Sequence, residues 1–153
     1  MLDHYSIGNI LFLDIETVPQ HASYDDLAPG MAALWEKKAQ QLNRAEKSIT
    51  DSPAEPQSVY ERAGIYAEFG KVVCISTGVF RNGTFWLKSF AGDQESALLT
   101  DFSEMLLRAG EKGFSHLCAH NGKEFDYPYL IRRMLINGLP VPPILDLSGK
   151  KPW

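Results

Sequence analysis

The stretch KVVCISTGVFRNGTFWLKSF, residues 71–90, decides the fold class because it predicts two neighbouring antiparallel strands. Residues 71–80 are rich in β-branched and apolar side chains, and residues 84–90 alternate as a returning strand does. The turn between them, RNG at residues 81–83, contains Asn-Gly, the strongest short signal for a hairpin. We therefore expect a sheet that is built around this hairpin.

The segments downstream of the hairpin predict a helix, a strand and a second helix. Residues 93–110, DQESALLTDFSEMLLRAG, offer Asp93 as an N-terminal cap and Gly110 as a stop. Residues 114–120, FSHLCAH, predict a further strand, and residues 127–138, YPYLIRRMLING, predict the second helix. The apolar face of the first helix consists of five side chains at helical spacing: Leu98, Leu99, Phe102, Met105 and Leu106.

Upstream of the hairpin lie one strand and a segment of different character. Residues 10–15, ILFLDI, are a short apolar run that predicts a strand. Residues 19–60 are rich in Ala, Gln, Glu and Lys and predict a helical insertion whose centre, at residues 48–57, is exposed or mobile. Helices are expected over residues 31–47 and 58–70.

The resulting order is strand, helical insertion, hairpin, helix, strand, helix. This order predicts an α/β fold with one mixed sheet of four strands flanked by helices. We expect residues 1–153 to form a single domain, because this length can bury a sizeable core.

Composition narrows the class of protein. The sequence has neither a basic N-terminal region nor an apolar run of about 20 residues, so we expect no signal peptide, no membrane partner and a cytoplasmic location. Cys74 and Cys118 lie in strand-like contexts and predict reduced core residues. The net charge of −4 argues against a broad basic surface that coats nucleic acid. It leaves room for an enzyme whose divalent ions bridge acids and phosphates.

Two acids, Asp14 and Glu16, are two residues apart on the first predicted strand. Strand side chains alternate, so both carboxylates point to the same face, where like charges repel each other. A divalent cation such as Mg²⁺ removes that penalty, because it prefers carboxylate oxygens. The alternative is an ordinary pair of acids that faces solvent at a strand end.

A third acid, Asp126, lies at the start of the last predicted helix, two residues before Pro128. This position suits an N-terminal cap, and a capping acid has a fixed place from which it can also hold an ion. The preceding loop, with His120 and Asn121, connects a strand to a helix, and such loops border the ligand crevice of open α/β sheets. Phe125 is either a core residue or a surface on which a base stacks.

Taken together, FLDIETVP (residues 12–19) and AHNGKEFDYPYLIRR (residues 119–133) resemble the first two motifs of the DEDD (DnaQ-like) 3′–5′ exonucleases. The likeness is greatest to the proofreading exonuclease domain of family B DNA polymerases and to stand-alone bacterial predicted exonucleases related to it. The string N-G-x-x-F-D-x-P-Y-L-x-x-R in residues 121–133 is long and specific, and YAEFGKVVCISTGVF (residues 66–80) is similar to the second strand of those domains. The insertion at residues 19–60 matches least well.

The resemblance implies a ribonuclease-H-like fold and hydrolysis of phosphodiester bonds at nucleic-acid 3′ ends, with two divalent ions, Mg²⁺ or Mn²⁺. It implies that three acids bind metal and act in catalysis, while three further side chains position the end of a single-stranded DNA or RNA. The metal-binding and catalytic residues are Asp14, Glu16 and Asp126, and the substrate-binding residues are Thr17, Asn121 and Phe125. In such a site the ions stabilise the attacking and leaving oxygens, so the protein needs no Ser, Cys or Lys nucleophile.

The family's third motif, Tyr-x-x-x-Asp or His-x-x-x-x-Asp on a late helix, is missing from this sequence. After Asp126 the only acid is Asp146, which follows Pro142 by four residues and Val141 by five. Its surroundings, LPVPPILDLSGKKPW, are unsuited to a helix, so we interpret Asp146 as a strand-end or loop acid.

We further expect the fold to be C-terminally incomplete in this chain, with its last strand and helix beyond Trp153. As an isolated polypeptide it is expected to bind metal weakly, to hydrolyse slowly or not at all, and to self-associate through the incomplete sheet.

Several alternatives stay open at the level of sequence. A non-catalytic nucleic-acid-binding or interaction module on the same fold is the main alternative to the exonuclease, and an internally acting nuclease of the same fold is a third. His120 precedes the second motif, which argues against a role in activating water. The cations Lys123, Arg132 and Arg133 are either solvated helix charges or phosphate contacts.

Overall fold

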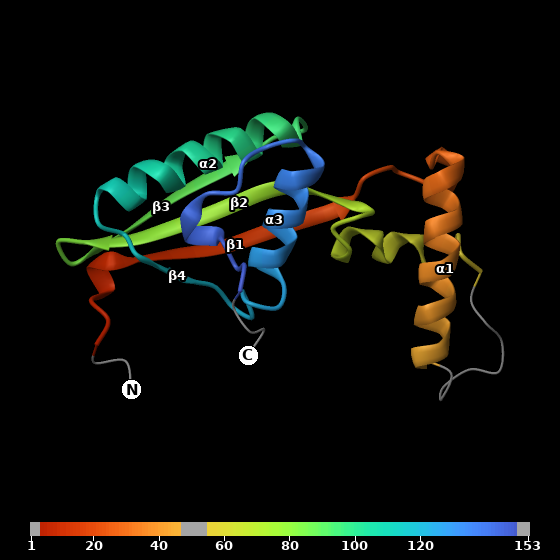
Figure 1. The fold of residues 1–153 in the computed structure, drawn as a ribbon, viewed down its shortest axis with the longest axis horizontal. Helices are drawn as coiled ribbons and strands as arrows, with labels where there is room; N and C mark the ends of the chain where they lie inside the picture. Colours follow the sequence, from red (N-terminus) through yellow and green to blue (C-terminus); the bar gives the residue numbers. More distant parts are fainter. Residues whose placement is uncertain (1–3, 47–54, 150–153) are drawn as a thin grey trace. The chain divides into compact units, whose positions relative to one another are not determined.

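The computed structural model describes residues 4–46 and 55–149, and it has the predicted α/β architecture (Figure 1). The chain divides into two compact units, one of Met1–Glu16 with Val72–Trp153 and the other of Thr17–Lys71. The insertion predicted at residues 19–60 falls within the second unit. In the described part of the chain, no helix has the length and apolar character needed to cross a membrane.

Four strands form a mixed sheet, as expected from the sequence, and their order in the sheet is β3-β2-β1-β4. The strands are β1 (Ile10–Pro19), β2 (Gly70–Arg81), β3 (Thr84–Ala91) and β4 (His116–Cys118). The hairpin prediction is confirmed, since β2 and β3 pair antiparallel and Arg81 lies opposite Thr84. Asn82 and Gly83 both have positive φ, of 51° and 76°, as the favoured two-residue hairpin turn requires.

Two helices complete the first unit, α2 (Glu95–Glu111) and α3 (Asp126–Ile136). Two predicted caps are wrong, because the residues that precede the helices are Gln94 and Phe125, and neither makes a side-chain capping hydrogen bond. The expected caps stand elsewhere: Asp93 lies one residue before the cap position, and Asp126 is already the first helical residue. The Asp126 carboxylate therefore does not cap α3 and is available for contacts with another element.

The core of this unit follows the alternation of β1. Leu11, Leu13 and Ile15 are buried, and the predicted apolar face of α2 is buried except for the half-buried Met105. Phe90 of β3 contacts Phe102 of α2 edge to face, with ring centroids 5.9 Å apart. Burial of this apolar surface is the main source of stability for the sheet and its helices.

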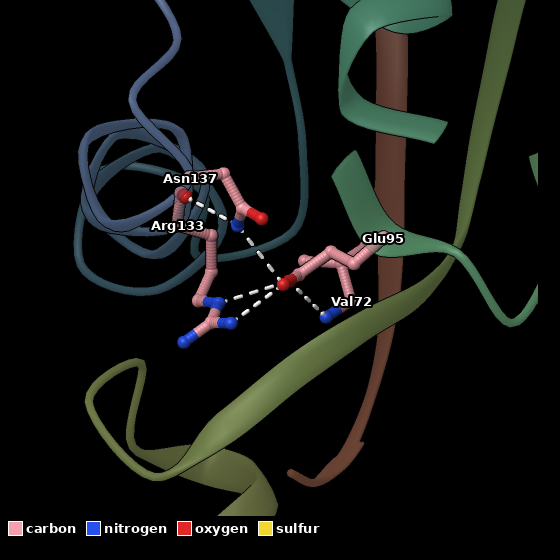
Figure 2. A network of polar contacts seen from close by, with 4 residues as sticks. All are labelled: Val72, Glu95, Arg133 and Asn137. Atoms are coloured by element: carbon pink, nitrogen blue, oxygen red, sulfur yellow. Dashed lines mark hydrogen bonds and ion pairs between the residues drawn. The ribbon is translucent and has the colours of Figure 1, made fainter. Parts of the chain in front are cut away.

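A buried polar network joins the two helices to the sheet (Figure 2). Arg133 of α3 donates to both carboxylate oxygens of Glu95, the first residue of α2, with Nε 2.9 Å from Oε1. The same carboxylate accepts hydrogen bonds from the backbone N–H of Val72 and from the side-chain amide of Asn137. Arg133 is therefore a structural residue, and its interpretation as a solvated helix charge is wrong.

The second unit has its own aromatic core. Trp35 of α1 (Pro29–Glu46) is fully buried, and its ring contacts Tyr60 and Phe69 edge to face. The helix predicted at residues 31–47 is confirmed, whereas only a short 3-10 helix, Tyr60–Ile65, forms within the helix expected at 58–70. Of the predicted exposed or mobile centre, residues 48–54 lie outside the described residues, and Pro56 accepts a hydrogen bond from the Trp35 indole.

Candidate functional site

Strand β1 carries Asp14 and Glu16 on one face. Both side chains are exposed and alternate with the buried Leu13 and Ile15, so the expectation that the two acids share a face is confirmed. Both acids remain in contact with solvent, which avoids a desolvation penalty. The pair is thus accessible to an ion or a substrate, as well as to water.

The loop between β4 and α3 has a tightly specified backbone. Asn121 has a left-handed φ of 54°, and its carbonyl accepts the backbone N–H of Phe125. Gly122 is buried, and a Cβ there would stand 2.6 Å from the Cβ of Ala119 and 2.7 Å from the ring of Tyr127. The glycine is needed for this close approach, which fixes where α3 begins.

Asp126 projects from this helix start toward β1. The register of β4 against β1 ends at the pair Phe12 and Cys118, so β4 gives Ile15 no partner. The carboxylate of Asp126 accepts a hydrogen bond from the backbone N–H of Ile15, and the side chain is only 3% exposed. At Ile15, which lies between Asp14 and Glu16, the Asp126 carboxylate thus supplies the acceptor that a neighbouring strand would otherwise supply.

The electrostatic environment of Asp126 is unfavourable to its charge. Burial raises the pKa of the carboxyl group above its ordinary value, and hydrogen bonds from the backbone N–H groups of Asp126 and Ile15 only partly offset this. The negative charge of Asp14 raises the pKa further, and His120 lowers it. Among the described groups that shift this pKa, none is a lysine or an arginine.

The structure therefore brings Asp126 within electrostatic range of Asp14, which the sequence analysis required. Glu16 lies on the same exposed face as Asp14 but is not among the groups that shift the pKa of Asp126. No group of three or more His, Cys, Asp or Glu side chains within residues 4–46 and 55–149 is arranged to hold a metal ion. The three-acid metal site accordingly stays a prediction, and of its members only Asp14 is shown to influence the charge of Asp126.

The predicted substrate contacts lie in different settings. Asn121 is exposed in the loop before α3, and Phe125 is half-buried with its ring 5.4 Å from that of Tyr129. Thr17 is half-buried and is the first residue of the second unit. Their contacts with a nucleic acid remain predictions.

The sequence analysis missed one side chain beside the acids, that of Tyr127. Burial raises the pKa of its hydroxyl to about 12, with smaller contributions from Cys118 and Asp126, so the phenol keeps its proton at neutral pH. Tyr127 lines a shallow hollow with two residues of β4, Leu117 and Cys118, and with five residues of the loop that follows: Ala119, Asn121, Gly122, Lys123 and Glu124. An aromatic residue directly after Asp126 is visible in the sequence, but the close approach of Tyr127 to Gly122 is seen only in the structure.

Two further expectations were tested by the fold. Asp146 is an exposed loop acid whose carboxylate accepts hydrogen bonds from the backbone N–H and the hydroxyl of Ser148, in agreement with its interpretation. Cys118 is exposed and Cys74 half-buried, so the prediction of two core cysteines is wrong for Cys118. The cause is that β4 is an edge strand, which leaves one side of the residue uncovered.

Comparison with known proteins identified no relative. No protein-family model, no curated protein and no solved structure matches this chain.

Proposed function

We propose that this chain is a domain of a metal-dependent 3′–5′ exonuclease, with divalent ions held by Asp14, Glu16 and Asp126. The observation that carries the proposal is the position of Asp126, a buried acid with a raised pKa that interacts electrostatically with a second acid, Asp14. Proteins keep such an arrangement where a function needs it, because uncompensated buried charge is costly. The motifs that resemble the DEDD exonucleases contain the same three acids.

The side chains present suit a hard cation such as Mg²⁺ or Mn²⁺, because such ions bind carboxylate oxygens. Such ions generate a nucleophile from water and stabilise the charge of the transition state. Asp126 supplies a rigid ligand, since its helix start and its hydrogen bond to Ile15 fix its position. Asp14 and Glu16 supply exposed carboxylates that rotate to complete the site.

The proposed substrate is the 3′ end of a single-stranded DNA or RNA. Asn121 offers both a donor and an acceptor at the rim of the hollow beside Asp126. Phe125 offers a partly exposed ring, and stacking on such a ring tolerates any base. The chain has no Tyr-x-x-x-Asp or His-x-x-x-x-Asp after Asp126, so we expect its own hydrolysis to be slow.

One observation favours a second candidate function, a nucleic-acid-binding module without catalysis. The hydrogen bond between Asp126 and Ile15 gives this acid a structural role that requires no metal. On this alternative, Asp126 stabilises the edge of β1, and the exposed acids contact solvent only.

A 3′-end trimming assay distinguishes the two functions. The purified chain is incubated with Mn²⁺ and a single-stranded oligonucleotide labelled at its 5′ end, and the shortened products are measured over hours. We expect slow stepwise shortening that stops on addition of a chelator and that leaves a covalently closed circle intact. Asp126→Asn removes a proposed carboxylate ligand of the metal and should abolish the shortening, while Asp146→Asn, which changes an exposed loop acid, should keep the rate.

Binding of the oligonucleotide without metal-dependent shortening would favour the binding module. Equal shortening by the chain and by Asp126→Asn would contradict the proposed site, and cleavage of the circle would indicate an internally acting nuclease.

A further inference from the structure

Strand β3 is the outermost strand of the sheet, at the edge opposite β4. Its two-residue turn makes Arg81 and Thr84 a hydrogen-bonded pair, and such pairs alternate along an antiparallel ladder. Four alternate residues therefore direct their backbone N–H and C=O away from β2: Phe85, Leu87, Ser89 and Ala91. Within the described residues, nothing pairs with this outer edge.

The side chains of β3 are unusually apolar for a sheet edge. Phe85, Trp86 and Leu87 are consecutive, and their exposed fractions are 44%, 61% and 72%. Because consecutive strand residues point to opposite faces, apolar surface is exposed on both sides of the edge. Natural edge strands are commonly protected by charges or bulges, and on β3 the only charged side chain is Lys88.

A groove of about 740 Å³ runs between β3 and α2 and is lined by both acidic and basic side chains. Helix α2 runs back along β3 in the opposite direction, so its start lies near the end of β3 (Figure 1). Asp93 and Asp101 line the groove toward the start of α2, and Arg81, Arg108 and Lys112 line it toward the beginning of β3. Lys88 and Glu104 lie between these two groups. Two copies of β3 that run in opposite directions would therefore place the acidic end of one groove beside the basic end of the other.

We propose that β3 pairs antiparallel with β3 of a second copy of this chain, with the two Leu87 residues opposite each other at the two-fold axis. This register joins outward-directed backbone groups and places Trp86 of each copy opposite Lys88 of the other. The acidic end of each groove then lies beside the basic end of the other, so the surface is self-complementary. The contact uses the β3 edge of the sheet and does not depend on nuclease activity.

Sedimentation equilibrium over micromolar to millimolar protein concentrations tests this dimer with two matched leucine variants. Leu87→Lys puts two ammonium groups at the axis and removes the apolar contact, so we expect dimerisation to weaken about 100-fold. Leu107→Lys makes the same chemical change at another exposed leucine, on α2, and should leave dimerisation unchanged. Circular dichroism of both variants verifies that each is folded.

Disulfide cross-linking supplies a second test that does not depend on the stability of a charged variant. In a background with Cys74→Ser and Cys118→Ser, oxidation of Leu87→Cys should yield a covalent dimer, and oxidation of Leu107→Cys should not. A wild-type chain that stays monomeric throughout the concentration range would overturn the proposal. So would a dimer that Leu87→Lys leaves intact, or equal cross-linking at both positions.

Discussion

Glu95 and Asp126 occupy equivalent positions in the fold and have opposite electrostatic environments. Each is the first residue of a helix, each is buried, and each accepts a hydrogen bond from the backbone N–H of an adjacent strand. Burial raises the pKa of both, but Arg133, Val72 and Asn137 outweigh this at Glu95 and bring its pKa below the ordinary value. At Asp126 the balance remains on the raised side, with Asp14 adding to it.

The difference shows what a buried acid at a helix start needs in this protein. Glu95 has a guanidinium group that satisfies both oxygens, so its site is complete without a ligand (Figure 2). Asp126 accepts a backbone hydrogen bond and is influenced by a second acid, Asp14. Apart from His120, none of the described groups that shift the pKa of Asp126 carries a positive charge. We infer that a divalent cation fills at Asp126 the role that Arg133 fills at Glu95.

The largest effect is expected from removing the acid of the complete site. Glu95→Ala leaves the buried Arg133 guanidinium without its partner, and breaking a buried pair in this way costs about 3–5 kcal/mol. Urea unfolding measures the loss. The double variant Glu95→Met with Arg133→Met removes both charges and should recover most of the stability. A loss below about 1 kcal/mol for Glu95→Ala would show that the network contributes little and would break the comparison.

A smaller loss is expected where the loop positions Asp126. Gly122→Ala places a Cβ against Ala119 and the ring of Tyr127, and such overpacking costs about 1–3 kcal/mol. Gly110→Ala is the matched control, because no atom lies within 4 Å of its added Cβ and alanine favours the helix. Thermal unfolding of the two variants should shift in opposite directions; equal shifts would show that Gly122 is not constrained by Tyr127.

Removing the charge of Asp126 should have the opposite sign from the change at Glu95. Asp126→Asn keeps an oxygen acceptor for the Ile15 N–H and ends the repulsion from Asp14, so we expect unchanged stability or a gain of up to about 1 kcal/mol at neutral pH. The same urea experiment measures it, without added metal. A loss comparable to that of Glu95→Ala would mean that the Asp126 carboxylate is already balanced in the metal-free protein.

The two acids should also respond to pH in opposite directions. The lowered pKa of Glu95 means that its stabilisation is present above the unfolded-state pKa and is lost as pH falls through the folded-state value. The raised pKa of Asp126 means that folding is favoured with the proton bound, so stability falls as pH rises through this range. Unfolding free energies of Glu95→Gln and Asp126→Asn, each compared with wild type across the acid range, should converge on wild type as pH falls. A constant difference for either variant would contradict the assigned shift.

The sequence determined the elements well but not the environments of single charges. The hairpin at residues 71–90 and the helix over Leu98, Leu99 and Phe102 follow from local spacing, which acts before tertiary contacts form. The pairing of Glu95 with Arg133 joins residues 38 positions apart, and no local pattern marks it. For the same reason Asp126 was expected to cap the helix, whereas its carboxylate accepts a hydrogen bond from the backbone of Ile15 in β1.

The sequence indicated which residues belong to the candidate site, but it did not indicate their geometry. Alternation predicted that Asp14 and Glu16 share an exposed face, and the motif around Asp126 indicated its proximity to them. The early end of β4, which leaves Ile15 available to Asp126, depends on the loop through Asn121 and Gly122 and could not be read from the strand pattern.

The carboxyl carbon of Asp126, observed by ¹³C NMR during a pH titration with and without Mg²⁺, tests the central claim most directly. Without metal, we predict a pKa above the ordinary aspartate value of 3.8, and with Mg²⁺ we predict that the pKa falls, because the cation favours the ionised form. Asp146, titrated in the same spectra, should be unaffected by the ion. A pKa of Asp126 that is the same with and without Mg²⁺ would contradict the account.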